Sequence, residues 1–529
     1  MFLLAGNTVC AQQPVQINLP PTDTTKSIEI IRGRSMRLKT IDSVTTLQTL
    51  AGDAMVRQGN TTLAADSIVI NRNTSIAEAF GNVKINDADS VFTSARYLKY
   101  IGKDRIAYLK DKVVFTDHKG ILQTDDLEYD LKTGIAIYKN GGRILNEKTV
   151  LTSKEGVYYS DTKDVYFKKN VHLVDPNYDI HTDSLLYNTS TSIATFIAPT
   201  HIVSKDGVVD TKSGTYDLKT GKAVFYERTA FRDSTHSGIA DNIAIDDKTG
   251  MIQMSGKAKL VDSSNNVTVL AGVIFLDRNK NSFLASQKPV MILYRDNDST
   301  YIAADTLFSG LRKYDSLAKK EILVKDTLKN AARINTNTTD TAIRYFLAFN
   351  HVRIFNDSLQ AVSDSLYYAS DDSTFKLFRD PIIWNAKTQV SGDTIYLFTE
   401  KQKAKRLYVF NNGIVINEAN PKMYNQIGGR TLNGYFVEGN IDYMRVKGSP
   451  AESISYPQDD DSAYTGMNRT SGDIIDIYFL HKDVNKVKFT NDVNGTMYPI
   501  RQIPEEAKFL KNFKWQDKRR PKNKLELFE

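Results

Sequence analysis

The sequence predicts an all-β protein made of repeated antiparallel strands, and three features of the chain lead to this fold class. A short strand motif returns at intervals of about 29 residues, or twice that, along much of the chain. Between its copies lies a second strand pattern, in which alternating apolar residues are interrupted by a turn residue. The chain also contains 27 Tyr and 24 Phe but only 2 Trp and 13 Pro, a composition that fits strands.

The first strand motif is marked by an aspartate with an aliphatic residue two positions later. In the copy at residues 66–70, Asp66, Ile68 and Ile70 share one face of the strand, because side chains alternate with a period of two. A fixed period of this size indicates stacked units that cannot bury their apolar faces alone. We therefore expect function to lie in a long surface or groove. The marked aspartates are Asp66, Asp125, Asp183, Asp241, Asp305, Asp364 and Asp393.

The second strand pattern bends at a pivot. Apolar alternation in Ala77–Ile85 runs into Gly81 and Asn82 and then resumes, and Pro199 and Pro381 take the equivalent place in other copies. Gly, Asn, Asp or Pro inside a strand pattern marks a bulge or a sharp corner. The repeat therefore predicts strands that bend from one sheet into a second one.

Two facing antiparallel sheets, joined at these corners and growing along one axis, are the simplest architecture for such strands. With strands about 4.8 Å apart, a dozen units would enclose a groove on the order of 60 Å long. The residues that line its inner faces either hold a ligand or only close a dry core, and the sequence leaves both open. These candidate groove residues are Ile68, Ile70, Ala79, Val83, Ile85, Leu109, Val113, Leu127, Val171, Leu173, Leu185, Met254 and Leu260.

The strand-pivot-strand signature at 79–85, followed by a strand of the aspartate motif, resembles the OstA-like family. That family includes the periplasmic lipopolysaccharide-transport bridge protein and the N-terminal domain of the outer-membrane lipopolysaccharide assembly protein. The resemblance covers roughly residues 45–310 and 341–420. It implies an elongated, twisted β-jellyroll that opens like a V. Its apolar groove would hold lipopolysaccharide acyl chains, with the phosphorylated sugar head near the open edge.

Two differences from known members of the family limit how much of their architecture can be expected in this chain. The chain holds enough repeats for two or more jellyrolls, whereas a short bridge protein has one. Residues 420–529 are too few for the membrane barrel of the assembly protein. The chain therefore resembles a longer member of the family without a barrel.

Breaks in the period suggest a division of the chain. Residues 28–310 are expected to form OstA-like jellyroll repeats, 311–340 a linker or insertion, and 341–500 a second jellyroll region. Residues 501–529 form a basic C-terminal tail, and residues 1–11 resemble the end of a secretory signal peptide.

The tail combines a helix start with the densest run of basic residues. Pro504 followed by Glu505 and Glu506 is typical of a helix N-terminus. The basic run at 518–524 would either contact lipid phosphates or an acidic partner, or be solvated and disordered.

Charge and cysteine content narrow the class of protein. The 69 basic and 62 acidic residues are interleaved, and a net charge of +7 without clustering argues against a nucleic-acid binder. Cys10 is the only cysteine, so disulfides and cysteine metal sites are excluded; whether Cys10 is lipidated stays open. No later stretch approaches the run of about 18 apolar residues of a membrane helix. A soluble periplasmic protein, at most peripheral to the outer membrane, is expected.

No catalytic, metal or cofactor site is expected. Ser160 and Lys163 have the Ser-x-x-Lys spacing of some hydrolases, as do Ser316 and Lys319, but both pairs fall in polar loop sequence. His172, His181 and Asp183 lie close in sequence without the helical spacing of a zinc motif, and the Asp belongs to the repeat.

The leading hypothesis is a non-enzymatic carrier or bridge for lipopolysaccharide, joined to other jellyroll transport proteins by pairing of edge strands. A structural or adhesive β-repeat scaffold with a closed core is the alternative. A carbohydrate-active enzyme would need paired carboxylates that break the repeat on one face, and we identify no such pair.

Overall fold

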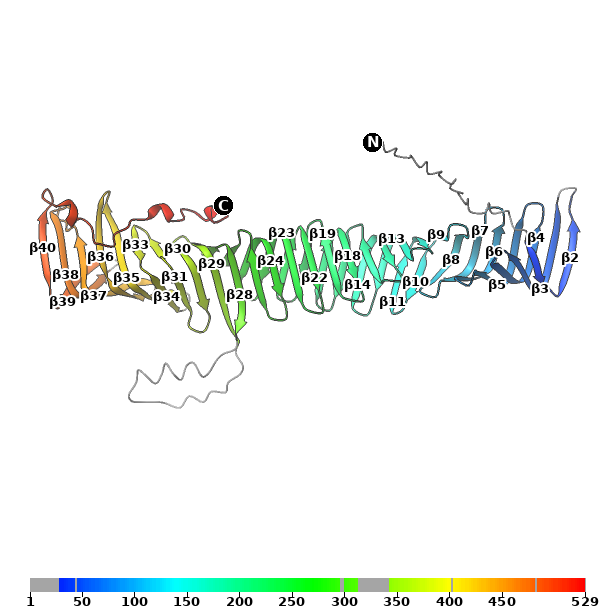
Figure 1. The fold of residues 1–529 in the computed structure, drawn as a ribbon, viewed down its shortest axis with the longest axis horizontal. Helices are drawn as coiled ribbons and strands as arrows, with labels where there is room; N and C mark the ends of the chain where they lie inside the picture. The colour runs from blue at the N-terminus through cyan, green and yellow to red at the C-terminus, as the bar shows by residue number, and fades with distance from the viewer. Residues whose placement is uncertain are drawn as a thin grey trace, which may run out of the picture. The chain divides into compact units, whose positions relative to one another are not determined.

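The computed structural model describes residues 28–42, 45–294, 299–312, 342–400, 403–480 and 483–528 (Figure 1). The described chain forms two compact units, one ending at Ser192 and one beginning at Ile193. Every strand pair described within them is antiparallel, and the few helical turns are short 3-10 helices. The prediction of an all-β, antiparallel fold is confirmed.

Unit 1 consists of strands joined by short turns. They are β1 (Glu29–Arg32), β2 (Ser35–Thr40), β3 (Thr46–Gln58), β4 (Thr61–Asn71), β5 (Ile76–Asp87), β6 (Val91–Ile101), β7 (Ile106–Thr116), β8 (Ile121–Asp130), β9 (Ile135–Tyr138), β10 (Gly142–Asn146), β11 (Thr149–Ser153), β12 (Glu155–Tyr159), β13 (Asp164–Val174) and β14 (Tyr178–Asn188).

Unit 2 continues the same pattern and ends in three 3-10 helices. Its first strands are β15 (Ile193–Phe196), β16 (Thr200–Ser204), β17 (Gly207–Thr211), β18 (Ser213–Asp217), β19 (Lys222–Tyr226), β20 (Thr229–Arg232), β21 (His236–Ala240), β22 (Asn242–Asp246), β23 (Met251–Asp262), β24 (Val267–Asp277), β25 (Ser282–Ser286), β26 (Val290–Tyr294), β27 (Ser299–Ala303) and β28 (Thr306–Arg312). They are followed by β29 (Ile343–Phe355), β30 (Gln360–Ala369), β31 (Thr374–Phe378), β32 (Ile382–Asn385), β33 (Thr388–Ser391), β34 (Thr394–Glu400), β35 (Lys403–Asn420), β36 (Met423–Val437), β37 (Asn440–Ser455), β38 (Gly466–Leu480), β39 (Asp483–Thr490), β40 (Asn494–Pro499), η1 (Glu505–Ala507), η2 (Asp517–Arg519) and η3 (Lys524–Leu527).

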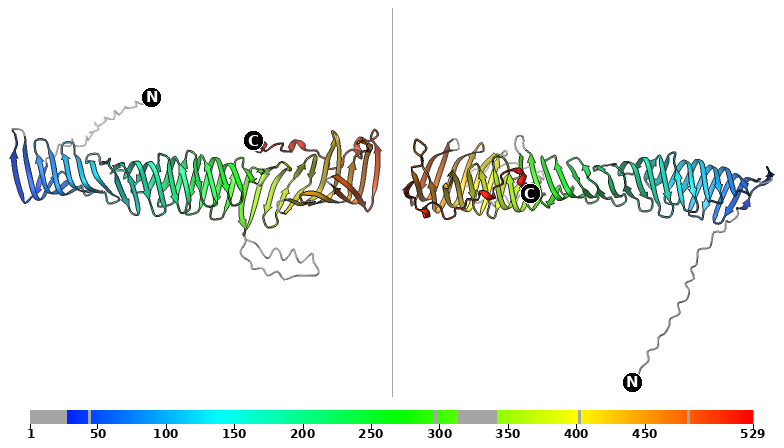
Figure 2. Two further views of the ribbon diagram at one scale, coloured as in Figure 1. Left: turned by 180° about the vertical axis from the view of Figure 1, so that it is seen from behind. Right: turned by 90° about the horizontal axis from the view of Figure 1, so that it is seen from above.

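The long strands each contribute to two sheets, as the sequence predicts. In β5, residues Ile76–Phe80 and residues Val83–Asp87 pair with different halves of the same two strands, β4 and β6, and the register shifts between the halves. We call the sheet containing Ile76–Phe80 the first sheet and the one containing Val83–Asp87 the second sheet. Equivalent halves of the strands in unit 2 carry the same names. Figure 2 shows the strands of each unit following one another in chain order.

The corners between the halves have a shared backbone geometry. Two successive residues adopt positive φ, for example Gly81 at 69° and Asn82 at 43°. A Cβ built on Gly81 would lie 2.3 Å from Asp66 Oδ2, so this corner requires glycine for space as well as for φ. Other corner pairs with this backbone are Gly52 and Asp53, Asp111 and Lys112, Lys169 and Asn170, Glu227 and Arg228, Gly256 and Lys257, Gln287 and Lys288, Asn350 and His351, Arg379 and Asp380, Asn411 and Asn412, and Asn491 and Asp492.

The marked aspartates of the repeat accept hydrogen bonds from residues at these corners. Asn82 Nδ2 donates to Asp66 Oδ2 at 3.0 Å, and the amide of Asn412 donates to Asp393 Oδ1 at 3.1 Å. Around the corner near residue 140 the acceptor is Asp126, one position after the predicted Asp125. The aspartate recurs with the period because each corner leaves polar groups that a short carboxylate can satisfy.

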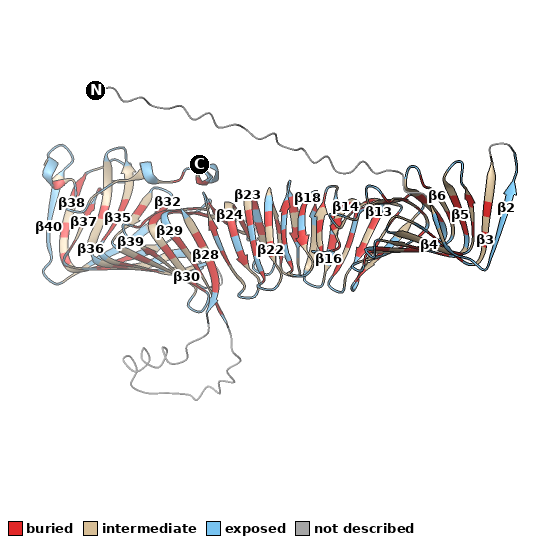
Figure 3. Cartoon of the chain, turned by 45° about the vertical axis from the view of Figure 1, so that its right-hand side comes forward, coloured by how far each residue is buried: buried red, intermediate tan, exposed pale blue. Residues whose placement is uncertain are grey.

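Apolar side chains alternate inward along nearly every strand, and Figure 3 shows the buried residues as stripes across both units. None of the helices among the described residues is long and apolar enough to cross a membrane. Residues 1–11, and the expected linker from residue 313 on, lie outside the described ranges. On either side of that gap, β28 pairs directly with β29. The division into jellyroll regions at 28–310 and 341–500 stays a prediction.

Candidate functional site

The interior between the two sheets receives every candidate groove residue. Eleven of the thirteen lie in unit 1 on β4, β5, β7, β8, β13 and β14, and Met254 and Leu260 lie on β23 of unit 2. None of the thirteen has an exposed fraction above 4%. The sequence thus identified inward-facing positions correctly, whereas their contact with a lipid stays a prediction.

This interior is closely packed. In unit 1, a cavity of about 20 Å³ lies among Val56, Leu63, Ile85 and Leu98, and another of about 10 Å³ lies beside Phe115. In unit 2, a cavity of about 30 Å³ lies between the sheets near Phe225. These volumes count the space open to the centre of a water molecule, and about 10–15 Å³ of such space is enough to hold one water. An acyl chain would therefore enter this interior only if the sheets moved apart or side chains rearranged.

A row of tyrosines follows the repeat inside the first sheet. Tyr100, Tyr129, Tyr158, Tyr187 and Tyr216 are spaced 29 residues apart, and all are buried. The first four lie in unit 1 and Tyr216 lies in unit 2. We call them the tyrosine row. Sequence reasoning missed its role, although two members end copies of the aspartate motif and the spacing is visible in the sequence.

In unit 1 three of these hydroxyls bond across the gap between the sheets. Tyr129 donates to Asp87 Oδ2 at 3.1 Å, and Asp87 ends the second-sheet half of β5. Tyr100 donates to Gln58, the last residue of β3. Tyr158 donates to Asp117, which directly follows β7. These bonds hold the turn-bearing edges of the two sheets together, on the side away from the corners.

Of the residues at this edge that accept a tyrosine hydroxyl, Asp117 has the most hydrogen-bond and ion-pair partners. Its side chain is only 2% exposed, and Lys163 Nζ lies 3.0 Å from its Oδ2. The backbone N–H groups of Lys119 and Gly120 donate to Oδ1 at 3.0 and 3.1 Å. Burial by itself would raise the pKa of Asp117, but the bonds from Tyr158, Gly120, Lys163 and Lys119 outweigh it and lower the pKa. The carboxylate is therefore ionised at neutral pH.

The same contacts act on the phenol of Tyr158. Burial, and then the bond to the Asp117 carboxylate, raise its pKa well above the ordinary value. Tyr158 therefore stays protonated and donates. In unit 2, Tyr216 also donates to a carboxylate, that of Asp247, but this residue follows β22 in the same sheet. Arg278 pairs with Asp247 at 3.1 Å.

The C-terminal segment packs on the second sheet of unit 2. Ala507 and Leu510 are buried in a cluster with Ile414, Ile416 and Met467, and Leu527 is buried against Val290 and Ile292. Figure 1 shows this segment, in red, running back along the strands from β38 towards β29. Pro504 precedes η1 as the sequence predicts. We call residues 505–528 the strap.

Buried glutamines of the second sheet hold the backbone of the strap. Gln426 donates to the Lys508 carbonyl at 2.8 Å and accepts from the Leu510 N–H at 2.9 Å. Gln389 does the same with the Lys514 carbonyl and the Gln516 N–H, at 2.7 and 2.8 Å. Each amide thereby satisfies both a donor and an acceptor of the strap.

The basic run also contacts the protein itself. Arg520 Nε donates to Gln360 Oε1 at 2.9 Å, and Arg519 pairs with Asp380 at 2.8 Å. This segment is therefore not the solvated, disordered tail that was one of the two possibilities, because its side chains and backbone have partners on β30, β33 and β36.

The outermost strands expose backbone edges and apolar side chains. Among the described residues β2 pairs only with β3, and its Met36 and Leu38 are 58% and 61% exposed. At the other end of the chain β39 and β40 both pair with β38, and Val484 and Met497 are 57% and 52% exposed. Unpaired edges of this kind accept a further strand.

The hydrolase-like spacings have no catalytic geometry in the described chain. Lys163 binds Asp117, as above, and the N–H of Ser160 donates to the Gly134 carbonyl in a turn. Ser316 and Lys319 lie outside the described residues.

Comparison with known families gives two overlapping matches. Residues 26–183 match the family described as OstA-like protein, and residues 150–282 match the family described as LptA/(LptD N-terminal domain) LPS transport protein. Together they run from residue 26 to residue 282. No curated protein matches the chain.

One solved structure with some similarity is the crystal structure of LptH, the LptA homologous periplasmic component of the conserved lipopolysaccharide transport device from Pseudomonas aeruginosa. The match has 13% sequence identity and covers 29% of this chain and 98% of LptH. Its TM-score of 0.16 is too low to support an argument about fold or function.

Proposed function

Because residues 26–183 of this chain match the OstA-like family and residues 150–282 match the LptA/LptD N-terminal family of LPS transport proteins, we propose that the protein carries or bridges lipopolysaccharide through the periplasm, with acyl chains between its two sheets. The observation that carries this proposal is the inward-facing, mostly apolar stripe that each unit contains within the matched residues. Burial of acyl chains there would contribute about 0.8 kcal/mol per CH2 group. No chemical step is needed for this role.

Loading of such a ligand requires the closed interior to open. The tyrosine row marks where the sheets of unit 1 separate, because its bonds join their turn-bearing edges while the corners hold the opposite side. Breaking these bonds exposes the inward stripe without disrupting either sheet. The phosphorylated sugar head would then stay at the opened edge, where Lys163 and the turns lie.

A structural or adhesive β-repeat scaffold is the second candidate. The small cavities favour it, since the interior satisfies its own packing without a ligand. The two candidates differ in whether lipid reaches inward-facing positions.

Photocrosslinking decides between these candidates. With a photoreactive residue at Ile85 or Leu127, which are 4% and 2% exposed, we expect crosslinks to lipopolysaccharide in cells, read as a mass shift that antibody to lipopolysaccharide detects. The same residue at Lys84 or Glu128, the outward-facing neighbours, should give at most weak crosslinks. Equal labelling of inward and outward positions, or none at any, contradicts the carrier role and favours the scaffold.

Partner jellyrolls would add at the exposed end strands, a proposal supported by the free edge of β2. We expect Leu38→Lys to weaken association with a partner jellyroll at least tenfold, because a lysine on an edge strand disfavours strand addition. Size-exclusion chromatography with the partner measures this. Lys39→Leu on the same strand is the matched control, and a complex that survives Leu38→Lys unchanged excludes this edge.

A further inference from the structure

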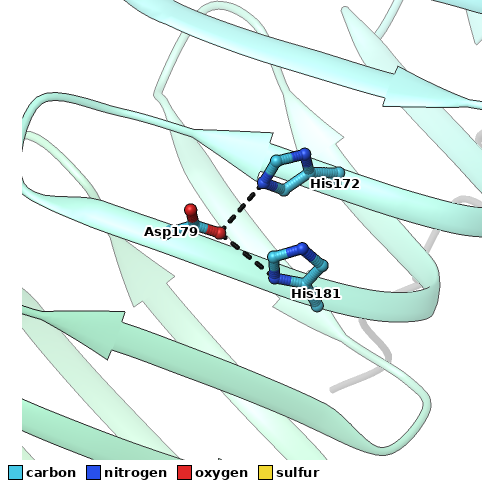
Figure 4. Close-up of side chains that lie close together, drawn as sticks. All are labelled: His172, Asp179 and His181. Carbon is cyan, nitrogen blue, oxygen red and sulfur yellow. Dashed lines mark hydrogen bonds and ion pairs between the residues drawn. The ribbon is translucent and has the colours of Figure 1, made fainter.

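Two histidines and one aspartate converge on the outer face of unit 1, away from the interior. His172 lies on β13, and Asp179 and His181 lie on β14 (Figure 4). His172 and His181 are direct cross-strand partners, and Asp179 is two residues from His181 on the same face. All three side chains are accessible, with exposed fractions of 39%, 48% and 58% for His172, Asp179 and His181.

Their polar atoms point at a common position. His172 Nε2 lies 2.9 Å and His181 Nδ1 lies 3.1 Å from the same oxygen, Asp179 Oδ1. The three ligand atoms all lie within 4.8 Å of one another. The imidazole rings are stacked, with centroids 4.1 Å apart and planes 23° apart, so both nitrogens approach the carboxylate from neighbouring positions.

From this geometry we infer that His172, Asp179 and His181 form a binding site for a divalent transition metal ion, with Zn²⁺ as the best match. Imidazole nitrogen and carboxylate oxygen bind Zn²⁺ at about 2.0–2.2 Å, which puts neighbouring ligands of a tetrahedral ion roughly 3.3 Å apart. The observed separations from Asp179 Oδ1 are close to this, so small side-chain rotations suffice. Water would complete the coordination, because the site faces solvent. Two imidazoles disfavour Mg²⁺ and Ca²⁺, which prefer oxygen ligands.

The proton balance of binding is simple. Without metal, Asp179 Oδ1 can accept one N–H from each neutral ring. When the ion binds, each neutral ring shifts its single proton to its other nitrogen, so that the nitrogen facing the carboxylate has a free lone pair for the metal and no proton is released. Neutral imidazole is the ligand form in either state.

Sequence spacing pointed to the wrong carboxylate for such a site. Asp183, also on the His181 face, belongs to the corner, where its Oδ1 accepts the N–H of Asn170. Asp179 lies on the other side of His181, where the hairpin brings β13 and β14 together. The cross-strand partner of His181 is visible only once the register of the two strands is known.

Zinc titration of the tag-free, chelator-treated full chain tests the proposal. We expect one Zn²⁺ per chain, measured by isothermal titration calorimetry and by competition with a chromogenic chelator. The double variant His172→Ala with His181→Ala should bind at least 100-fold more weakly, and Asp179→Asn at least tenfold. Cu²⁺ serves as a second probe, whose electron paramagnetic resonance spectrum should show coupling to two nitrogens in the wild-type chain and not in the double variant.

His351→Ala is the matched control. His351 Nδ1 lies 2.9 Å from Asp305 Oδ2, so this pair has the same contact distance but only one histidine. It should leave stoichiometry and affinity unchanged. Equal metal-free melting temperatures show that the variants are folded. Wild-type affinity no higher than that of the double variant, or a Cu²⁺ spectrum unaffected by its substitutions, overturns the assignment.

Discussion

Deletion of residues 505–529 is expected to destabilise unit 2 and to expose an apolar surface on its second sheet. Leu510 and Leu527 leave their clusters, and Ile414, Ile416 and Met467 lose their cover. Loss of a single buried leucine side chain typically costs about 2–5 kcal/mol, so the full deletion should lower the melting temperature of unit 2 by many degrees. Gln389 and Gln426, both fully buried now, also lose their partners.

Two measurements show the effect of the deletion. A hydrophobic dye should bind the truncated chain several-fold more strongly, and thermal unfolding should resolve into two transitions of which only one has moved.

Point variants separate loss of the strap from general damage. Leu510→Ala removes a side chain that is 5% exposed and should destabilise the protein by about 3 kcal/mol. Phe509→Ala removes an adjacent side chain that is 40% exposed and should cost well under 1 kcal/mol. Similar stabilities for the two variants, or unchanged dye binding after deletion, would contradict a strap that covers the sheet.

The strap also shows which contacts the sequence could not predict. Gln389 reads as an ordinary strand residue, and its partners at Lys514 and Gln516 lie more than a hundred residues away. Nothing periodic connects them, because the strap is outside the repeat. The start of the short 3-10 helix after Pro504 was predictable, since a proline followed by acidic residues is a signal that is local in sequence.

Inside the repeat, the sequence predicted which way the side chains face and left the distance between the two sheets open. Strand alternation identified Ile68, Val83 and Leu127 as inward-facing, because a period of two fixes the face of each side chain. Alternation does not fix the gap between facing sheets, which depends on how side chains of both interdigitate. The open groove that the family resemblance implies therefore was not derivable from the stripe, and the structure packs these residues against each other. The cross-sheet bonds of Tyr129 and Tyr158 follow from that close approach.

Replacement of Asp117 by alanine is expected to open this edge of unit 1. Tyr158 and Lys163 lose their shared acceptor, as do the N–H groups of Lys119 and Gly120. Removing one partner of a buried ion pair typically costs about 3–5 kcal/mol, and the partial exposure of Lys163 places this case near the lower limit. Urea denaturation of the variant should show that loss in the transition of unit 1.

The pH dependence of stability provides a second readout for Asp117. Its pKa in the folded chain is lowered, so the unfolded state binds more protons and the carboxylate contributes stability above the unfolded value of about 3.9. That contribution is lost as the pH falls from there through the folded pKa. Asp117→Asn should therefore flatten the decline in stability below about pH 4.5, whereas Asp104→Asn, in an exposed turn, should leave it unchanged.

Lipid uptake connects this edge to the proposed function. If acyl chains enter between the turn-bearing edges, Asp117→Ala should speed uptake of lipopolysaccharide several-fold under conditions where the variant is still folded, because fewer bonds must break before the inward stripe is reached. Crosslinking at Ile85 over a time course measures the rate. An unchanged rate in a folded, destabilised variant would show that the edge holds the sheets together without controlling entry, and the carrier would then have to load elsewhere along the interior.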